Sequence, residues 1–239
     1  DNPDSRPYYE AALAERGATW DVWDTGNSDD EPDTATLALY EIVIWFTGDT
    51  FSVTTGPAAA SEAALAAWFE GSPGACLFIS SQEYHFIRGL TPFMIDYLGA
   101  AAIQNDNGDY QSVLGQGPFA GTTYGLDYPF ADFSDTVEPG TGSVAFVGEN
   151  GRNGALYRHA GAWRTTFWTF PLEAISPADA RADALARVLA WCSGDVTSVQ
   201  LDSLIVQPRD SVGGAARFGV LAAIGILLVV ASRRRQRGP

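Results

Sequence analysis

Two uninterrupted apolar runs place the strongest constraint on how this chain can fold. They are Ile42–Phe46 (IVIWF) and Cys76–Ile79 (CLFI), and Asp21–Trp23, together with Trp20, is a shorter candidate strand. Apolar runs of this length that do not alternate with polar residues are typical of parallel strands covered on both faces. These runs alternate with helical segments, so the sequence predicts a doubly wound, mostly parallel α/β sheet.

Three segments carry helix signals. The first is Ser5–Arg16, which stops at Gly17, and the second is Ser61–Glu70, which stops at Gly71. A final helix opens at Ser176–Asp179, with Pro177 at its first position. Ser61 and Ser176 are the predicted N-caps, because a serine hydroxyl can accept a hydrogen bond from a free backbone N–H group of the first turn.

Residues 104–162 interrupt this alternation. The segment is rich in Gly, Asp, Tyr and Pro, and a turn cluster at Glu149–Gly154 separates the apolar runs Val144–Val147 and Ala155–Tyr157. This pattern predicts a β-rich insertion of hairpins. Trp163–Phe170 is predicted to return to the sheet as the last strand before the final helix.

Charge divides the chain into an acidic body and a basic end. The net charge is −15, yet residues 213–239 contain five arginines and no acid. The acidic body would repel phosphate groups, so no nucleic-acid partner is expected.

The basic end follows an apolar run, which predicts a membrane segment. Phe218–Ser232 carries no charge, and extension to residues 212–232 gives a helix long enough to span a bilayer. The arginines that follow it form a stop on the cytoplasmic side: Arg233, Arg234, Arg235 and Arg237. The expected organisation is a body over 1–192, a stalk over 193–211, a transmembrane helix over 212–232 and a cytoplasmic tail over 233–239. The body would lie outside the membrane, and the alternative is a buried C-terminal core helix.

The same end resembles a sorting signal. Gly213–Gly214, an apolar span and an arginine cluster follow one another, as in the GlyGly-type C-terminal signals of bacterial surface proteins. In that family a rhomboid-like protease cuts near the glycines. The resemblance therefore implies the bacterial cell envelope or surface, and leaves open a permanent anchor or a processed signal.

The body resembles the class I glutamine amidotransferase-like superfamily, and more narrowly a domain that accompanies peptidase modules in exported bacterial proteins. The residues that carry the likeness are DNPDSRPYY at the start, Trp20–Asp24, Tyr40–Asp49, Leu77–Tyr84, Gly151–Tyr157 and Phe170–Ile175. The resemblance implies a flavodoxin-like fold. In that family a hydrophobic strand precedes the opening segment, so the first strand is expected to be missing here.

The catalytic residues of that superfamily are absent. Its nucleophilic Cys follows a central strand, where this chain has Ile79–Glu83, and its His follows the last strand, where this chain has Phe170. Glutamine hydrolysis is therefore not expected, and the function that follows is a non-catalytic accessory or binding domain.

A serine hydrolase is an alternative. Its candidate residues are Ser80, Ser81, Glu83, His85, His159 and Glu173, with a histidine as base for one serine. The simpler interpretation is that Ser80 and Ser81 satisfy backbone groups at the end of the strand.

An acidic run after the first short strand is a candidate calcium site. Asp24, Asp29, Asp30 and Asp33 offer oxygen ligands at close spacing, although the pattern lacks the glycine and the final Glu of an EF-hand. A solvated acidic loop explains the run equally.

Cys76 and Cys192 either form a disulfide or are two small buried residues. Cys76 starts a strand and Cys192 ends a helix antiparallel to the strands, which places both at one end of the sheet. Pairing would be in keeping with an oxidising compartment outside the cytoplasm.

Aromatic residues suggest a third function. Tyr157, Trp163, Phe167 and Trp168 could form a platform on which sugars stack, which would make the domain a carbohydrate-binding surface module. Packing of the core is the competing explanation for the high aromatic content.

Overall fold

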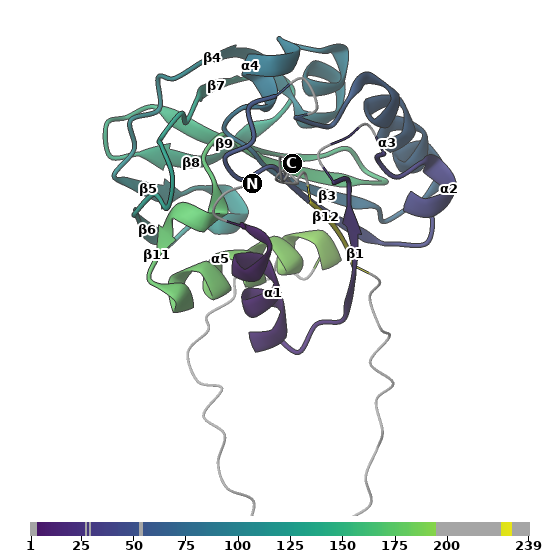
Figure 1. The fold of residues 1–239 in the computed structure, drawn as a ribbon. Coiled ribbons are helices and arrows are strands. Elements are labelled where there is room, and N and C mark those ends of the chain that lie inside the picture. Colours follow the sequence, from purple (N-terminus) through teal and green to yellow (C-terminus); the bar gives the residue numbers. More distant parts are fainter. Residues whose placement is uncertain (1–3, 27, 29, 53–54, 195–225, 231–239) are drawn as a thin grey trace, which may run out of the picture.

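The computed structural model describes residues 4–26, 28, 30–52, 55–194 and 226–230. Within them, one sheet contains ten strands in the order β1-β12-β2-β3-β10-β9-β8-β5-β6-β11 (Figure 1). The fold class is mixed α/β, as predicted. The parallel half consists of β1 (Trp20–Asp24), β12 (Ile226–Val230), β2 (Ile42–Phe46), β3 (Cys76–Ser80) and β10 (Arg164–Trp168).

The parallel half has a flavodoxin-like strand order, 2-1-3-4-5. The numbers in that order count strands along the chain of a flavodoxin-like protein. Here β12 stands where such a protein has its first strand. The second to fifth strands correspond to β1, β2, β3 and β10. The predicted strands at Trp20, Ile42, Cys76 and Trp163 are therefore confirmed, each within one or two residues at its ends.

Helices cover both faces of the parallel half. Side chains alternate along β2: Ile42 and Ile44 pack in the same core cluster as helices α1 (Arg6–Glu15) and α5 (Ala178–Ser193). Val43 and Trp45 pack on the opposite face, in the cluster that contains α3 (Ala59–Gly71). All five residues of β2 are buried, which explains why this strand reads as an uninterrupted apolar run.

The predicted insertion forms the antiparallel half of the sheet. The hairpin at the turn cluster is confirmed, with β8 (Ser143–Gly148) paired to β9 (Asn153–His159). The sheet continues through β5 (Ser112–Gly115), β6 (Thr123–Leu126) and β11 (Ile175–Ser176). A separate two-stranded ribbon pairs β4 (Ala100–Gln104) with β7 (Thr136–Pro139).

The remaining helices are short. They are α2 (Thr34–Leu37), α4 (Tyr84–Arg88), the π-helical turn Met94–Leu98 and the 3-10 turns Gly117–Phe119 and Leu172–Ala174. The predicted N-caps are displaced: α3 starts after Ala58 rather than Ser61, and α5 starts after Pro177 rather than Ser176.

Of the segment predicted to be a transmembrane helix, residues 212–232, the structure describes only Ile226–Val230. Ile226–Val230 forms strand β12, parallel to both β1 and β2, and Leu227 and Val229 are buried. A central parallel strand and a membrane helix both require an uninterrupted apolar run, so hydropathy alone did not distinguish them. In the described part of the chain, no helix has the length and apolar character to cross a bilayer.

Several sequence features of the C-terminal end fall outside the described residues. They are Gly213 and Gly214, the arginines at 233, 234, 235 and 237, and the stalk beyond Gly194.

The disulfide is confirmed. Cys76, at the start of β3, is bonded to Cys192, in the last turn of α5, with a Cα–Cα distance of 5.3 Å. The bond ties the C-terminal helix to the centre of the sheet.

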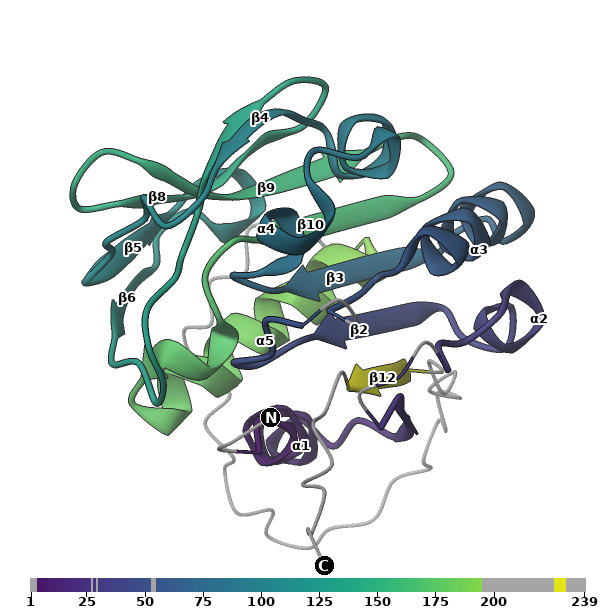
Figure 2. The same cartoon turned by 45° about the horizontal axis from the view of Figure 1, so that its top comes forward.

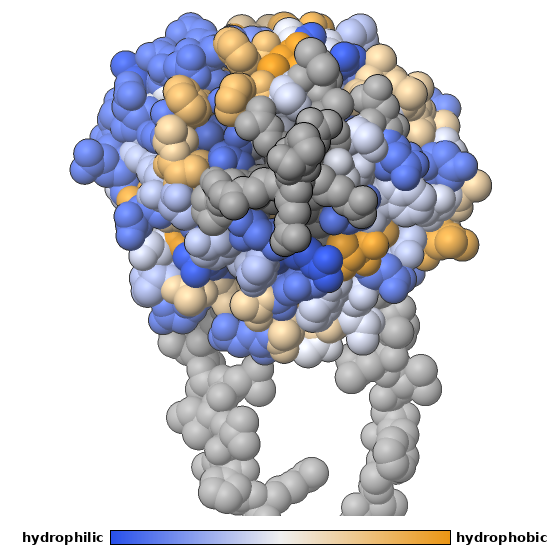
Figure 3. Space-filling model, in the orientation of Figure 1, coloured by the Kyte–Doolittle hydropathy of each residue, from blue (hydrophilic) through white to orange (hydrophobic). Residues whose placement is uncertain are grey.

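The described surface is mostly hydrophilic on the face shown in Figure 3. Figure 3 shows a face on which hydrophilic residues predominate and apolar residues occur in small groups. On this face the coloured residues form no single broad apolar patch.

Candidate functional site

The candidate site lies where β2, β3 and β10 end. In open parallel sheets ligands bind at this edge, outside the carboxyl ends of the strands. Ser80 is the last residue of β3 and is level with Trp168 of β10 and Phe46 of β2. The segment Ser81–Glu83 then turns into α4.

The Ser81 hydroxyl is occupied by structural hydrogen bonds. Its Oγ lies 2.7 Å from Oγ1 of Thr47, which follows β2. It also accepts hydrogen bonds from the backbone N–H groups of Glu83, at 3.3 Å, and Tyr84, at 3.1 Å. The side chain is buried. Ser81 therefore caps the turn into α4 and joins it to the neighbouring strand, as the simpler interpretation of the sequence proposes.

Ser80 joins β3 to the segment after β10. Its Oγ accepts a hydrogen bond of 2.9 Å from the backbone N–H of Leu172. Ser80 is 1% exposed.

Glu173 lies in the same buried region. Tyr9 of α1 donates a 2.9 Å hydrogen bond to its Oε2. Burial disfavours the charged carboxylate and raises the pKa of Glu173 to about 7. Burial, together with the negative charge of Glu173, raises the pKa of Tyr9 well above its usual range.

Phe170, which the sequence resemblance aligns with a histidine of the amidotransferases, belongs to the hydrophobic core. It is fully buried, stacks on Trp168 with ring centroids 5.3 Å apart, and meets the ring of Phe146 edge-on. Its side chain fills a packing position between the sheet and the insertion.

Gln82 forms two hydrogen bonds that hold part of the insertion next to the end of β3. Its Nε2 donates to the carbonyl of Ala131 at 3.0 Å, and its Oε1 accepts from the N–H of Phe133 at 3.2 Å. Farther along this segment, Asp135 exchanges hydrogen bonds with Thr169, which follows β10. The segment 131–135 is thus attached to both β3 and β10 at the edge where a substrate would enter.

Three carboxyl groups from different segments meet next to this attachment: Glu83, Asp106 and Asp135. Asp135 Oδ1 accepts a 3.1 Å hydrogen bond from the N–H of Asp106, and Asp135 is 1% exposed. Burial raises the pKa of Asp135 to about 8. Burial, and then the negative charge of Asp106, raises the pKa of Glu83 to about 7. Near neutral pH the carboxyl groups of Glu83 and Asp135 can therefore hold and exchange protons.

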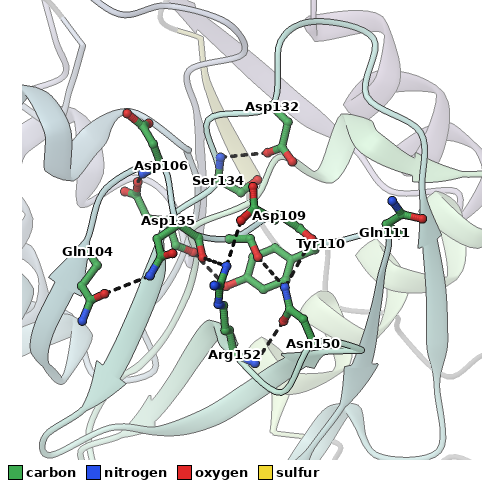
Figure 4. Close-up of polar contacts among 12 residues, drawn as sticks. Gln104, Asp106, Asp109, Tyr110, Gln111, Asp132, Ser134, Asp135, Asn150 and Arg152 are labelled. Carbon is green, nitrogen blue, oxygen red and sulfur yellow. Dashed lines mark hydrogen bonds and ion pairs between the residues drawn. The ribbon is translucent and has the colours of Figure 1, made fainter.

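A polar network lies beside Asp106 and Asp135 (Figure 4). The Tyr110 hydroxyl donates to the carbonyls of Asp135 and Asn153, at 2.9 and 3.0 Å. Asn150 donates to the carbonyl of Gly108 at 2.7 Å, and Arg152 forms an ion pair of 2.9 Å with Asp109. The ion pair is exposed and contributes about 1 kcal/mol or less to stability.

Beside the network lies an open polar cleft of about 460 Å³. Its lining consists of carboxylates, an amide, two tyrosines and one leucine, from Asp109, Tyr110, Gln111, Leu126, Asp127, Tyr128 and Asp132. No spacing pattern in the sequence groups these aspartates, although Asp106–Asp109 has the composition of a turn. Asp106 and Asp109 both adopt left-handed backbone conformations, which Asp tolerates better than most residues.

The two histidines lie in different places. His85, in α4, has Nδ1 hydrogen-bonded to Asn105 Oδ1. His159, at the end of β9, is level with Arg164, which in turn is level with Cys76 at the start of β3. His159 is therefore separated from Ser80 by the length of a strand, roughly 13 Å at about 3.3 Å per residue. The hydrogen bonds of Ser80 and Ser81 in the described structure involve neither imidazole.

The calcium candidates are placed only in part, because Asp29 lies outside the described residues. Asp24 accepts a hydrogen bond from the N–H of Gly26, and Asp33 caps α2 by accepting one from the N–H of Thr36, both at 2.8 Å. The hydrogen bonds from Thr36 lower the pKa of Asp33. Among the described residues, no group of three or more His, Cys, Asp or Glu side chains is arranged to hold a metal ion.

The proposed aromatic platform is not formed. Phe167 and Trp168 are fully buried. Trp163 instead packs against Phe69, with ring centroids 4.7 Å apart, and Arg158 lies over its ring. The aromatic content of this region serves packing.

Comparisons with known proteins support the fold. No family model and no curated protein matches the sequence. A putative GMP synthase component from Thermoplasma acidophilum is 10% identical, with a TM-score of 0.52, and the match covers 80% of this chain and 90% of that one. The cytoplasmic protein STM3548 from Salmonella typhimurium is 9% identical, with a TM-score of 0.51, over 77% of this chain and 85% of that one.

A larger protein also matches in part. An exo-β-1,4-mannosidase from Opitutaceae bacterium strain TAV5 is 15% identical, with a TM-score of 0.47, over 78% of this chain. This chain spans only 30% of the length of that enzyme. Together with the strand order, the similarity to the GMP synthase component shows that the fold is flavodoxin-like.

Proposed function

We propose that the chain is an extracytoplasmic, non-catalytic amidotransferase-like domain that serves as an accessory or binding module of an exported bacterial protein. The observation that carries this proposal is the use made of the strand-end residues. The hydroxyls of Ser80 and Ser81 hold the turn and the neighbouring segments, and Phe170 packs in the core. A nucleophile needs a free hydroxyl and a base within hydrogen-bond reach, and these residues have structural partners instead.

The disulfide supports a location outside the cytoplasm, since such bonds persist mainly in oxidising compartments. The association with a peptidase module rests on the resemblance of the sequence to domains of that kind. Membrane attachment through residues 212–232, with a rhomboid-like protease acting near Gly213–Gly214, is part of the proposal. It requires Ile226–Val230 to leave the sheet.

The experiment that tests the absence of catalysis is an activity panel on the full chain. Glutamine and sets of esters, peptides and glycosides are incubated with the protein, and products are measured by mass spectrometry. We expect no turnover above that of a heat-denatured sample. Hydrolysis that disappears in Ser80→Ala or Ser81→Ala, but not in the exposed control Ser143→Ala, would overturn the proposal.

A second candidate function is carbohydrate binding in the polar cleft. The cleft of about 460 Å³ offers carboxylate and amide groups for sugar hydroxyls, with Tyr128 at its side. A glycan array followed by calorimetry tests it. We expect binding that Gln111→Ala and Asp127→Ala weaken and Trp163→Ala leaves unchanged. Binding lost only in Trp163→Ala would contradict this location.

A further inference from the structure

Strand β12 enters the sheet from a distant part of the chain. It lies between β1 and β2 (Figure 2), and five consecutive residues pair in parallel with each neighbour. The preceding described element is α5, which ends at Ser193, and residues 195–225 lie outside the described part. No hairpin fixes β12 to either neighbour, because parallel strands cannot be joined by a tight turn.

The position that β12 occupies is needed by the rest of the sheet. Among the described strands, β1 pairs only with β12, and β12 provides the neighbour of β2 on that side. Leu227 and Val229 are 1% and 0% exposed, in the core cluster that includes Val43 and Trp45. Without an occupant, β1 would lose its ladder and one edge of the apolar strand β2 would be exposed.

A lipid bilayer is a second environment that suits the residues of β12. Ile226–Val230 falls inside the uncharged run Phe218–Ser232, which is followed by arginines and contains no acid. Such a run is stable in a bilayer as well as in a protein core. The two placements exclude each other, since the backbone groups of these residues pair either with β1 and β2 or within a membrane helix.

We propose that the slot between β1 and β2 is a strand-accepting site whose occupant, Ile226–Val230, exchanges between the sheet and the membrane. Insertion of the tail into a bilayer empties the slot and releases β1, while β3 and β10 stay paired. The part of this inference in which the segment enters a membrane rests on the proposed function. The part in which the segment fills the slot in the sheet does not.

Hydrogen exchange measured by mass spectrometry tests both parts on the full chain. The reporters are the amides of Trp20–Asp24 in β1, with Arg164–Trp168 in β10 as the internal reference. In buffer we expect β1 to be protected. With vesicles of phosphatidylcholine and phosphatidylglycerol we expect exchange in β1 to accelerate at least tenfold, with β10 unchanged.

Two variants test the placement in the sheet and the placement in the membrane separately. Leu227→Asp places a charge in the slot, so we expect β1 to lose its protection at least tenfold without vesicles. Ala222→Asp places the same charge in the uncharged run outside β12, so we expect protection of β1 to stay as in the wild type while vesicle binding falls at least tenfold.

Each result of these exchange measurements supports or refutes a part of the inference. If β1 is equally protected in Leu227→Asp and in the wild type, the slot does not hold this segment and the inference fails. If vesicles leave β1 protected, whether or not the chain binds them, the exchange is refuted, while the absence of catalysis is untouched. If Leu227→Asp unfolds the whole domain, Leu227→Ala is measured instead, and loss of protection in β1 ahead of β10 is the supporting result.

Discussion

Replacing Glu173 by Gln should change how the stability of the protein depends on pH. Burial raises the pKa of Glu173 to about 7 from its usual 4.5. The folded state therefore binds more protons than the unfolded state between these two pH values, and the free energy of unfolding falls as pH rises through that window. A difference of about 2.5 pKa units corresponds to roughly 3 kcal/mol, most of which is lost between pH 5 and pH 8.

The assay is urea-induced unfolding of the full chain, with its disulfide intact, at several pH values from 5 to 8. We expect Glu173→Gln to remove roughly 2–3 kcal/mol of the decrease seen in the wild type, since the neutral amide can still accept the hydrogen bond from Tyr9. Glu15→Gln, on the exposed side of α1, controls for the loss of one charge. An identical pH dependence in Glu173→Gln and the wild type would show that the buried carboxyl group has been misassigned.

Further variants test other parts of the structure. Asp135→Asn should remove a decrease in the free energy of unfolding that the wild type shows as pH rises from about 4 to about 8, because burial raises the pKa of Asp135 from its usual 3.8 to about 8. Replacing Cys76 and Cys192 by Ser should lower the free energy of unfolding by about 4–5 kcal/mol in urea, since the bond closes a loop with a sequence separation of 116. Gln82→Ala should cost about 1–3 kcal/mol and speed amide exchange in residues 131–135, whereas Gln104→Ala should do neither.

The parallel half of the fold could be predicted from the sequence because its strands carry their own signal. Ile42–Phe46 is apolar at every position, since both faces of β2 are buried, and the strand appears where the pattern places it. The hairpin at Glu149–Gly154 could also be predicted from the sequence, because turn residues separate two apolar runs.

The antiparallel half was harder to predict in detail. β5 and β6 have four residues each, and β11 has only two, so periodicity has too few positions to show. Strand β12 was missed for a different reason: hydropathy measures how apolar a segment is and carries no information on which apolar environment it enters.

The candidate site was predicted in location and only partly in content. The turn after β3 could be predicted from the residue types at Ile79–Glu83, and the absence of a histidine at Phe170 is visible in the sequence. The partners of Ser80 and Ser81, and the meeting of Glu83, Asp106 and Asp135, depend on contacts between segments far apart in the sequence. No local pattern encodes such contacts.

Labelling with a fluorophosphonate probe tests the central claim most directly. The full chain and a known serine hydrolase are treated in parallel, and intact mass and peptide mapping report any covalent adduct. If Ser80 and Ser81 serve only to hold the ends of the strands, the mass of this protein stays unchanged while the control enzyme is labelled. A stoichiometric adduct on either serine of the native protein, absent after denaturation, would establish an activated nucleophile and contradict the account.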